Sequence, residues 1–157
     1  MICPKCGGTI KVNKNCSKCG ISYDEMIGQI SHEEMISLFK KMHKKMSEHK
    51  NITLEESLLA CELHNSSLLV PIEVTDDDVA IGGIKNRRGK KFILLFTDKD
   101  EYDKCDFSMK PQTNPFREIL NLLEDNDAGF VINLKSIACE IPRQFIDRFF
   151  GDDLDVE

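Results

Sequence analysis

Two Cys-x-x-Cys pairs near the N-terminus constrain this chain more than any other feature. The pairs are Cys3/Cys6 and Cys16/Cys19, and nine residues separate them. Such a turn can aim two thiolates at one metal ion, at the Zn–S distance of about 2.3 Å. Glycines follow both pairs and permit the positive φ at which backbone N–H groups turn toward the sulfurs. The pattern predicts a Zn(Cys)4 site in a zinc ribbon, with residues 9–12 as a short strand.

Three other uses of these cysteines compete with a zinc site. Two disulfides would need an oxidising compartment. A redox Cys-x-x-Cys usually opens a helix in a thioredoxin-like unit, and the flanking sequence here favours strands. A [2Fe–2S] cluster is the remaining alternative. Because all four predicted ligands are thiolates, no position stays open for water, and we expect the zinc to be structural.

The remaining sequence indicates a cytoplasmic location. The chain begins Met1-Ile2-Cys3, without the layout of a signal peptide. It contains no run of about 20 apolar residues, so no membrane span is expected.

Charge is distributed unevenly along the chain. Residues 1–20 contain four lysines and no acid, whereas residues 51–157 contain 22 acids and 12 bases. The lysines Lys5, Lys11, Lys14 and Lys18 offset the negative charge of four thiolates. They also leave open a nucleic-acid-associated role for the ribbon, which is the alternative function. An acidic main domain disfavours it, because affinity for nucleic acid depends largely on neutralising phosphates.

The 157 residues suit one ordinary domain with a small appendage. We expect a zinc ribbon over residues 1–22, a connector and amphipathic helix over 23–50, an α+β domain over 51–150 and an acidic tail over 151–157. Strands and helices are mixed without strict β-α-β alternation. The expected fold class is therefore α+β, with a mixed β-sheet and flanking helices.

Helix-start signals divide the chain. Ser31 with Glu34, and Thr53 with Glu56, each form a capping-box pattern that predicts a helix start. Asp98 with Glu101 predicts a short helix over 99–105, and Asn114-Pro115 predicts another, with Asn114 as N-cap. Pro142 opens a last helix. The first helix carries one apolar stripe at helical spacing: Met35, Leu38, Phe39, Met42 and Met46.

Apolar runs between these helices predict strands over residues 68–74, 79–84, 91–96 and 130–134, and a short one over 136–140. The segment 82–89 is expected to be a hairpin tip, and residues 109–113 a loop.

Several of these segments occur in a recognisable order. They are Leu68-Leu69-Val70-Pro71, Phe96-Thr97-Asp98, Asn114-Pro115-Phe116, Gly129-Phe130-Val131-Ile132-Asn133 and Ile141-Pro142. This ordered set resembles the N-terminal domain of the SseB family. The chain departs from the family at Leu134-Lys135, where Pro-Gly often follows the Asn, and in its added N-terminal ribbon. The resemblance implies a bacterial, non-enzymatic module with no catalytic set to transfer.

No catalytic constellation is evident in the sequence. We expect the histidines (His32, His43, His49, His64) to be surface or satisfied residues and Cys61, Cys105 and Cys139 to be buried, inert thiols. The run Asp76-Asp77-Asp78 is expected to be a solvated turn. We therefore expect a non-enzymatic protein-interaction module whose partner is a protein that the sequence does not identify.

Overall fold

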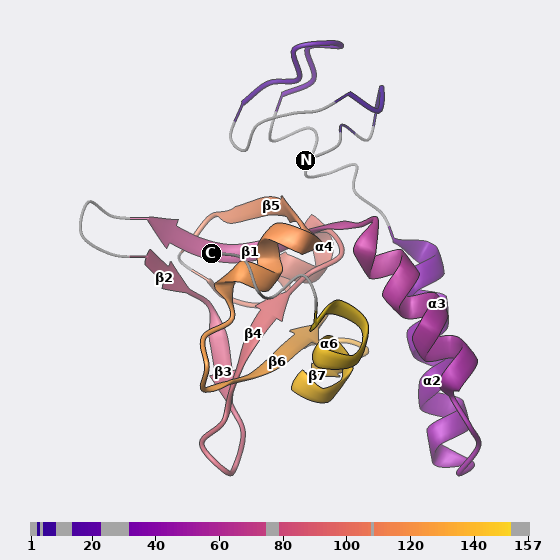
Figure 1. Cartoon of the computed structure of the whole chain (residues 1–157). Coiled ribbons are helices and arrows are strands. Elements are labelled where there is room, and N and C mark those ends of the chain that lie inside the picture. Colours follow the sequence, from indigo (N-terminus) through magenta and orange to yellow (C-terminus); the bar gives the residue numbers. More distant parts are fainter. Residues whose placement is uncertain are drawn as a thin grey trace.

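The computed structural model describes residues 3, 5–8, 14–22, 32–74, 79–107 and 109–151. The predicted ribbon strand, Ser31, the Asp76–Asp78 run and the acidic tail after Gly151 lie outside these residues. The α+β class is confirmed: two β-sheets are flanked by helices (Figure 1). The expected single mixed sheet is thus divided into a three-stranded and a four-stranded sheet.

The first sheet is antiparallel and has the order β2-β1-β5. Its strands are β1 (Ser67–Val74), β2 (Val79–Ile81) and β5 (Pro111–Pro115). Strand β5 overlaps residues 109–113, for which the sequence predicts a loop. Its prolines lie at the two ends of an edge strand, where a missing N–H costs no central ladder bond.

The second sheet is mixed and has the order β3-β4-β6-β7. Strands β3 (Gly83–Lys85) and β4 (Lys91–Leu95) form a hairpin, so the predicted 79–84 strand is broken at Gly82. Strand β6 (Asp127–Ile132) runs parallel to β4, and β7 (Cys139–Pro142) is antiparallel to β6. Strand β7 begins three residues later than the sequence predicted.

A pair of backbone hydrogen bonds joins the sheets, since Leu69 and Phe96 each donate to the other's carbonyl at 2.9 Å. Side chains of β4 alternate between two apolar clusters, as the two-residue period of a strand requires. Ile93 and Leu95 enter the main core beneath the helices, whereas Phe92 and Leu94 enter a smaller cluster with Tyr102. The sheet that bears β4 is therefore covered on both faces.

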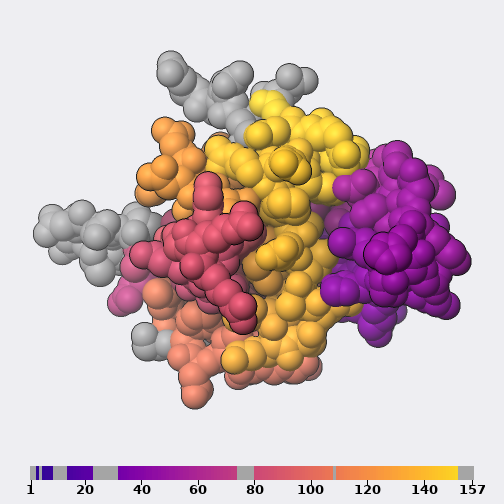
Figure 2. Space-filling model, turned by 90° about the horizontal axis from the view of Figure 1, so that it is seen from below, coloured from indigo at the N-terminus to yellow at the C-terminus, as the bar shows by residue number. Residues whose placement is uncertain are grey.

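Helices α2 (Glu33–Ser47) and α3 (Thr53–His64) form an antiparallel hairpin. Figure 2 shows this hairpin in purple along one side of the molecule, next to the yellow C-terminal segment. Lys45 pairs across the hairpin with buried Glu55, and this ammonium group lowers the pKa of the carboxyl. The predicted apolar stripe is only partly buried: Met35 and Phe39 are fully covered, whereas Met46 is 59% exposed.

The sequence misplaced three helix starts. The N-caps of α2 and α3 are His32 and Ile52, and neither caps through its side chain. The predicted Thr53 capping box is therefore wrong, whereas the Ser31 side chain lies outside the described residues. The Asn51 side chain instead accepts the Thr53 N–H at 2.7 Å. Helix α5 (Phe116–Ile119) has Pro115 as N-cap, because Asn114 pairs with β1 in strand β5.

The other two helix starts agree with the sequence. In α4 (Lys99–Asp103), the Asp98 carboxylate accepts the Glu101 N–H at 2.9 Å, as predicted. A 3-10 turn, η1 (Leu120–Leu122), continues α5. Helix α6 (Arg143–Phe150) follows Pro142 and buries Phe145, Ile146 and Phe150 in the main core.

Candidate metal centre and other candidate sites

The four N-terminal cysteines lie together, with all four sulfurs within 4.8 Å of one another. The distances Cys3 Sγ–Cys19 Sγ and Cys6 Sγ–Cys16 Sγ are both 3.6 Å. Four sulfurs at about 2.3 Å from a central zinc would be about 3.8 Å apart in a regular tetrahedron. The cluster therefore has the dimensions of a tetrathiolate site and could bind a metal ion.

Two backbone turns of the same form hold the sulfurs. Cys3 donates its N–H to Gly8 at 2.8 Å, and Cys16 donates to Ile21 at 3.0 Å. In each turn the glycine after the second cysteine donates back to the first cysteine, at 2.9 Å in both cases, with φ near +75°. Both turns thus depend on Gly7 and Gly20, which adopt a conformation that other residues rarely take.

The electrostatics of the cluster favour a bound cation. The Cys19 N–H lies 3.5 Å from Cys16 Sγ and lowers the pKa of the Cys16 thiol to about 6. Although the Ile21 N–H favours the Cys19 thiolate, burial and the three neighbouring sulfurs raise the pKa of Cys19 to about 11. Four thiols at such short distances therefore cannot all lose their protons readily until a cation offsets the charge of the thiolates.

Burial of the cluster is uneven. Cys3 and Cys16 are almost fully buried and pack with Ile21, whereas Cys6 and Cys19 are half-buried. Lys5, Lys14 and Lys18 are exposed nearby in the sequence, and Lys11 lies outside the described residues. With four sulfurs around one centre, a bound metal would have a full tetrahedral shell.

The remaining cysteines differ from one another. Cys139 is buried, and burial raises the pKa of its thiol to about 12. Cys105 is half-buried and its pKa is also raised by burial. Cys61 is exposed on α3, so the prediction that it is buried is wrong. Neither Cys105 nor Cys139 has the lowered pKa of a reactive thiol.

Two histidines have structural contacts. The ring of His32 shares a 2.7 Å hydrogen bond with the Ser67 carbonyl at the start of β1, so its Nε2 carries the hydrogen. Burial lowers the pKa of His32 and favours this neutral form. His64 stacks on Phe150 with ring centroids 6.5 Å apart. These contacts agree with the expectation of satisfied histidines.

Thr97 and Asn133 connect the carboxyl ends of the parallel strands β4 and β6. Asn133 Oδ1 accepts the Thr97 N–H, and Asn133 Nδ2 donates to Thr97 Oγ1, both at 3.0 Å. Asn133 has φ of +55°, and its N–H donates to the Leu95 carbonyl. Both side chains are buried, so their polar groups are used in holding the strands together.

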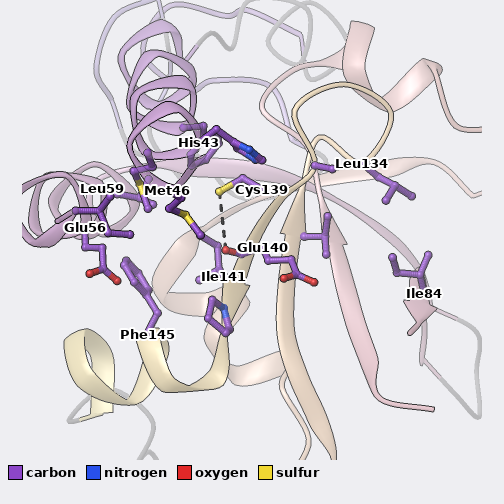
Figure 3. A pocket seen from close by; sticks show the side chains of 16 residues that line it. His43, Met46, Glu56, Leu59, Ile84, Leu134, Cys139, Glu140, Ile141 and Phe145 are labelled. Carbon is purple, nitrogen blue, oxygen red and sulfur yellow. Dashed lines mark hydrogen bonds between the residues drawn. The ribbon is translucent and has the colours of Figure 1, made fainter. Parts of the chain in front are cut away.

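A cavity of about 400 Å³ lies between helix α2, strand β7 and helix α6 (Figure 3). Its lining is mostly apolar, and the polar members are His43, Glu56 and Glu140. The apolar members include Phe39, Met42, Met46 and Phe145. Sequence reasoning missed this cavity. The signal within reach was the methionine stripe of α2, which is longer than the part of the helix that the core covers.

Comparison with known protein families decides the affiliation of the chain. Residues 45–148 match the family model described as the SseB protein N-terminal domain. The chain belongs to the SseB family. The resemblance noted in the sequence is thereby confirmed, and the four-cysteine cluster lies outside the matched residues.

No curated protein and no solved structure matches the chain significantly. Within the described residues, no helix is both long enough and apolar enough to cross a membrane.

The segments that carry the SseB resemblance are structural in this chain. Leu68 and Val70 are core residues of β1, and Thr97 and Asn133 join two strands. Gly129 packs closely against the backbone of β7. A Cβ at Gly129 would lie 2.1 Å from the Ile141 carbonyl oxygen, so only glycine fits there. The order of these segments therefore reflects how this domain is held together.

Proposed function

We propose that this SseB-family chain is a non-enzymatic protein-interaction module with a structural Zn(Cys)4 site in its N-terminal segment. The observation that carries the proposal is the apolar surface of the α2–α3 hairpin. Met46, Leu54 and Leu58 are 59%, 67% and 46% exposed. Leu54 and Leu58 stand one helical turn apart on α3, and large exposed apolar side chains grouped in this way are typical of a surface that another molecule covers.

Two further observations support the non-enzymatic role. The SseB motif residues Thr97, Asp98 and Asn133 are engaged in hydrogen bonds that join strands or cap a helix. A metal held by four thiolates would have no open position at which water or substrate could bind. On this proposal the zinc folds its segment, since so small a unit has little core of its own.

The proposed partner is a protein rather than nucleic acid, in a reducing cytoplasm. Residues 51–157 contain 22 acids against 12 bases, and such a surface repels phosphates. The alternative, phosphate contacts by the ribbon lysines, would require binding that weakens steeply with salt.

Affinity capture from the native host tests the proposal. The baits are the full chain and a variant with Leu54 and Leu58 both replaced by Lys, which changes only exposed positions of α3. We expect a protein that the full chain captures at stoichiometric levels and the variant does not. Capture of nucleic acid instead, released by moderate salt, would refute the proposal.

A further inference from the structure

Strand β7 is an open edge of the second sheet. It is the last strand in the order β3-β4-β6-β7, and β6 is its only partner strand in the described structure. An open edge carries unpaired N–H and C=O groups that can accept a further strand.

The direction of the β6 backbone identifies the residue of β7 that faces outward. The Asn133 N–H points to β4, where it meets the Leu95 carbonyl. Because backbone groups alternate in direction along a strand, the N–H and C=O groups of Phe130 and Ile132 point toward β7. The backbone N–H and C=O groups of their register partners, Ile141 and Cys139, therefore point toward β6. Glu140, between them, directs its N–H and C=O to the open edge.

The neighbours of Glu140 shorten this edge. Pro142 has no N–H, and its carbonyl stands at the N-cap of α6, where it accepts a helical bond. The Ala138 N–H is already bonded to the Asn133 carbonyl at 2.9 Å. Glu140 thus offers the one complete donor–acceptor pair, with only the Cys139 thiol 3.9 Å from its carbonyl.

The cavity lies along this same edge. All five consecutive residues 138–142 line it, together with Phe39, Met42 and Met46 of α2 and Phe145 of α6. Figure 3 shows Met46, Cys139, Ile141 and Phe145 gathered on one side of the strand, with Ile84 and Leu134 on the other. The cavity volume of about 400 Å³ is in the range of known ligand sites. Methionine side chains adapt readily to apolar groups of different shape.

Alternation along β7 gives the two faces different chemistry. Cys139 and Ile141 belong to the apolar cluster on the methionine side. Glu140 lies on the opposite face, across from Val131, and is exposed. Its carboxylate forms no ion pair with any residue that the structure describes.

We propose that the edge of β7 binds an extended peptide in which one Lys or Arg stands between two apolar residues. The peptide adds an antiparallel strand through its backbone contacts with Glu140. Residues opposite Cys139 and Ile141 place apolar side chains toward Met42, Met46 and Phe145. The residue opposite Glu140 places its cation beside that carboxylate, since directly opposed side chains share a face. This inference rests on the proposed interaction role and adds a second contact site to the exposed α2–α3 surface, with Met46 of that hairpin lining the new site.

Fluorescence anisotropy with a defined peptide tests the inference. The probe is the labelled, C-amidated peptide Thr-Val-Lys-Val-Thr, and the matched probe has Glu in place of Lys. We expect the purified full chain to bind the Lys peptide with a Kd on the order of 100 µM or tighter. Glu140→Lys should weaken that binding at least about fivefold and should strengthen binding of the Glu peptide by a similar factor.

Further variants separate the two contacts. Met46 is exposed, and Met46→Lys should weaken the binding of both peptides. The same loss is expected when the substitution is made in the unmodified chain and in the Glu140→Lys variant. Methylating the backbone nitrogen of the central Lys should abolish binding, because that N–H meets the Glu140 carbonyl. Glu73, another exposed acid, lies on β1, and Glu73→Lys is the matched control that should leave both affinities unchanged.

Three results would overturn the inference. They are no binding at 1 mM peptide, binding that the Glu140 charge reversal does not move, and binding that survives N-methylation. If the peptides fail while the full chain still captures a protein from the host, the edge is not the site and the proposed function stands. If capture also fails, the interaction role itself is wrong.

Discussion

Replacing Asn133 with Ala tests whether the Thr97–Asn133 pair holds the carboxyl ends of β4 and β6 together. The side chain accepts one hydrogen bond from Thr97 N–H and donates one to Thr97 Oγ1, each at 3.0 Å. Asn133 is 1% exposed and Thr97 is fully buried. Water cannot replace the lost amide without rearrangement of the strands.

The expected magnitude follows from three contributions. The Thr97 N–H would be left buried and unpaired, which costs about 1–3 kcal/mol. Loss of the second hydrogen bond costs about 0.5–1.5 kcal/mol. Ala must also adopt the φ of +55° that Asn133 has, which costs about 1 kcal/mol more than Asn or Gly. We therefore expect a loss of about 3–5 kcal/mol in the free energy of unfolding.

Urea unfolding followed by far-UV circular dichroism measures this loss. Asn133→Gly is the matched control, because it removes the same side chain and relieves the backbone strain. We expect it to be less destabilising than Asn133→Ala by about 1 kcal/mol. A loss below about 1 kcal/mol for both variants would show that the pair does not hold the strands, and the structural interpretation of these motif residues would be refuted.

Three other perturbations follow from the described contacts. Gly129→Ala should lower the free energy of unfolding by at least about 3 kcal/mol or prevent folding, because the added Cβ would meet the Ile141 carbonyl and φ at this position is +141°. Gly151→Ala, where the added Cβ would meet open space, should leave stability unchanged in the same urea assay. His32→Gln should keep a donor for the Ser67 carbonyl and remove the titrating group. Burial lowers the folded-state pKa of His32 below 6.5, so the unmodified chain should lose stability as pH falls from 6.5 toward that pKa. In parallel thermal melts, the variant should lose less stability over the same pH window. A zinc chelator should leave the melting temperature of the SseB domain unchanged, and unfolding of the domain together with the N-terminal segment would contradict independent folding.

The metal-site geometry was within reach of the sequence because it is local. Two residues between paired cysteines and a glycine after each pair determine a turn almost completely. The same holds for the Asp98 cap of α4, where the side chain and the N–H that it accepts are three residues apart. Within each cysteine turn and within the α4 cap, the atoms that interact belong to one short segment.

Features that depend on distant segments were predicted less well. Strand β5 exists because residues 111–115 pair with β1, and its two prolines resemble loop residues when considered alone. The pattern around Asn114 predicted a helix cap, but pairing with Leu68 draws that residue into a strand. Tertiary pairing outweighed local propensity there.

The cavity beside β7 could not be predicted for a related reason. The α2 stripe is regular in sequence, yet the core covers Met35 and Phe39 and stops short of Met46. Nothing within α2 indicates where that coverage ends, because it depends on how far the hairpin extends past β7. The opposing residues Cys139 and Phe145 are about a hundred positions away along the chain.

The metal content of the purified chain tests the central claim most directly. Native mass spectrometry of the full chain should give one zinc per chain, with a mass that corresponds to four lost thiol protons. Cys16→Ser should lose the zinc, whereas Cys61→Ser, at an exposed position away from the cluster, should retain it. A metal-free chain whose N-terminal segment is nevertheless folded, or zinc retained in Cys16→Ser, would contradict a structural Zn(Cys)4 site.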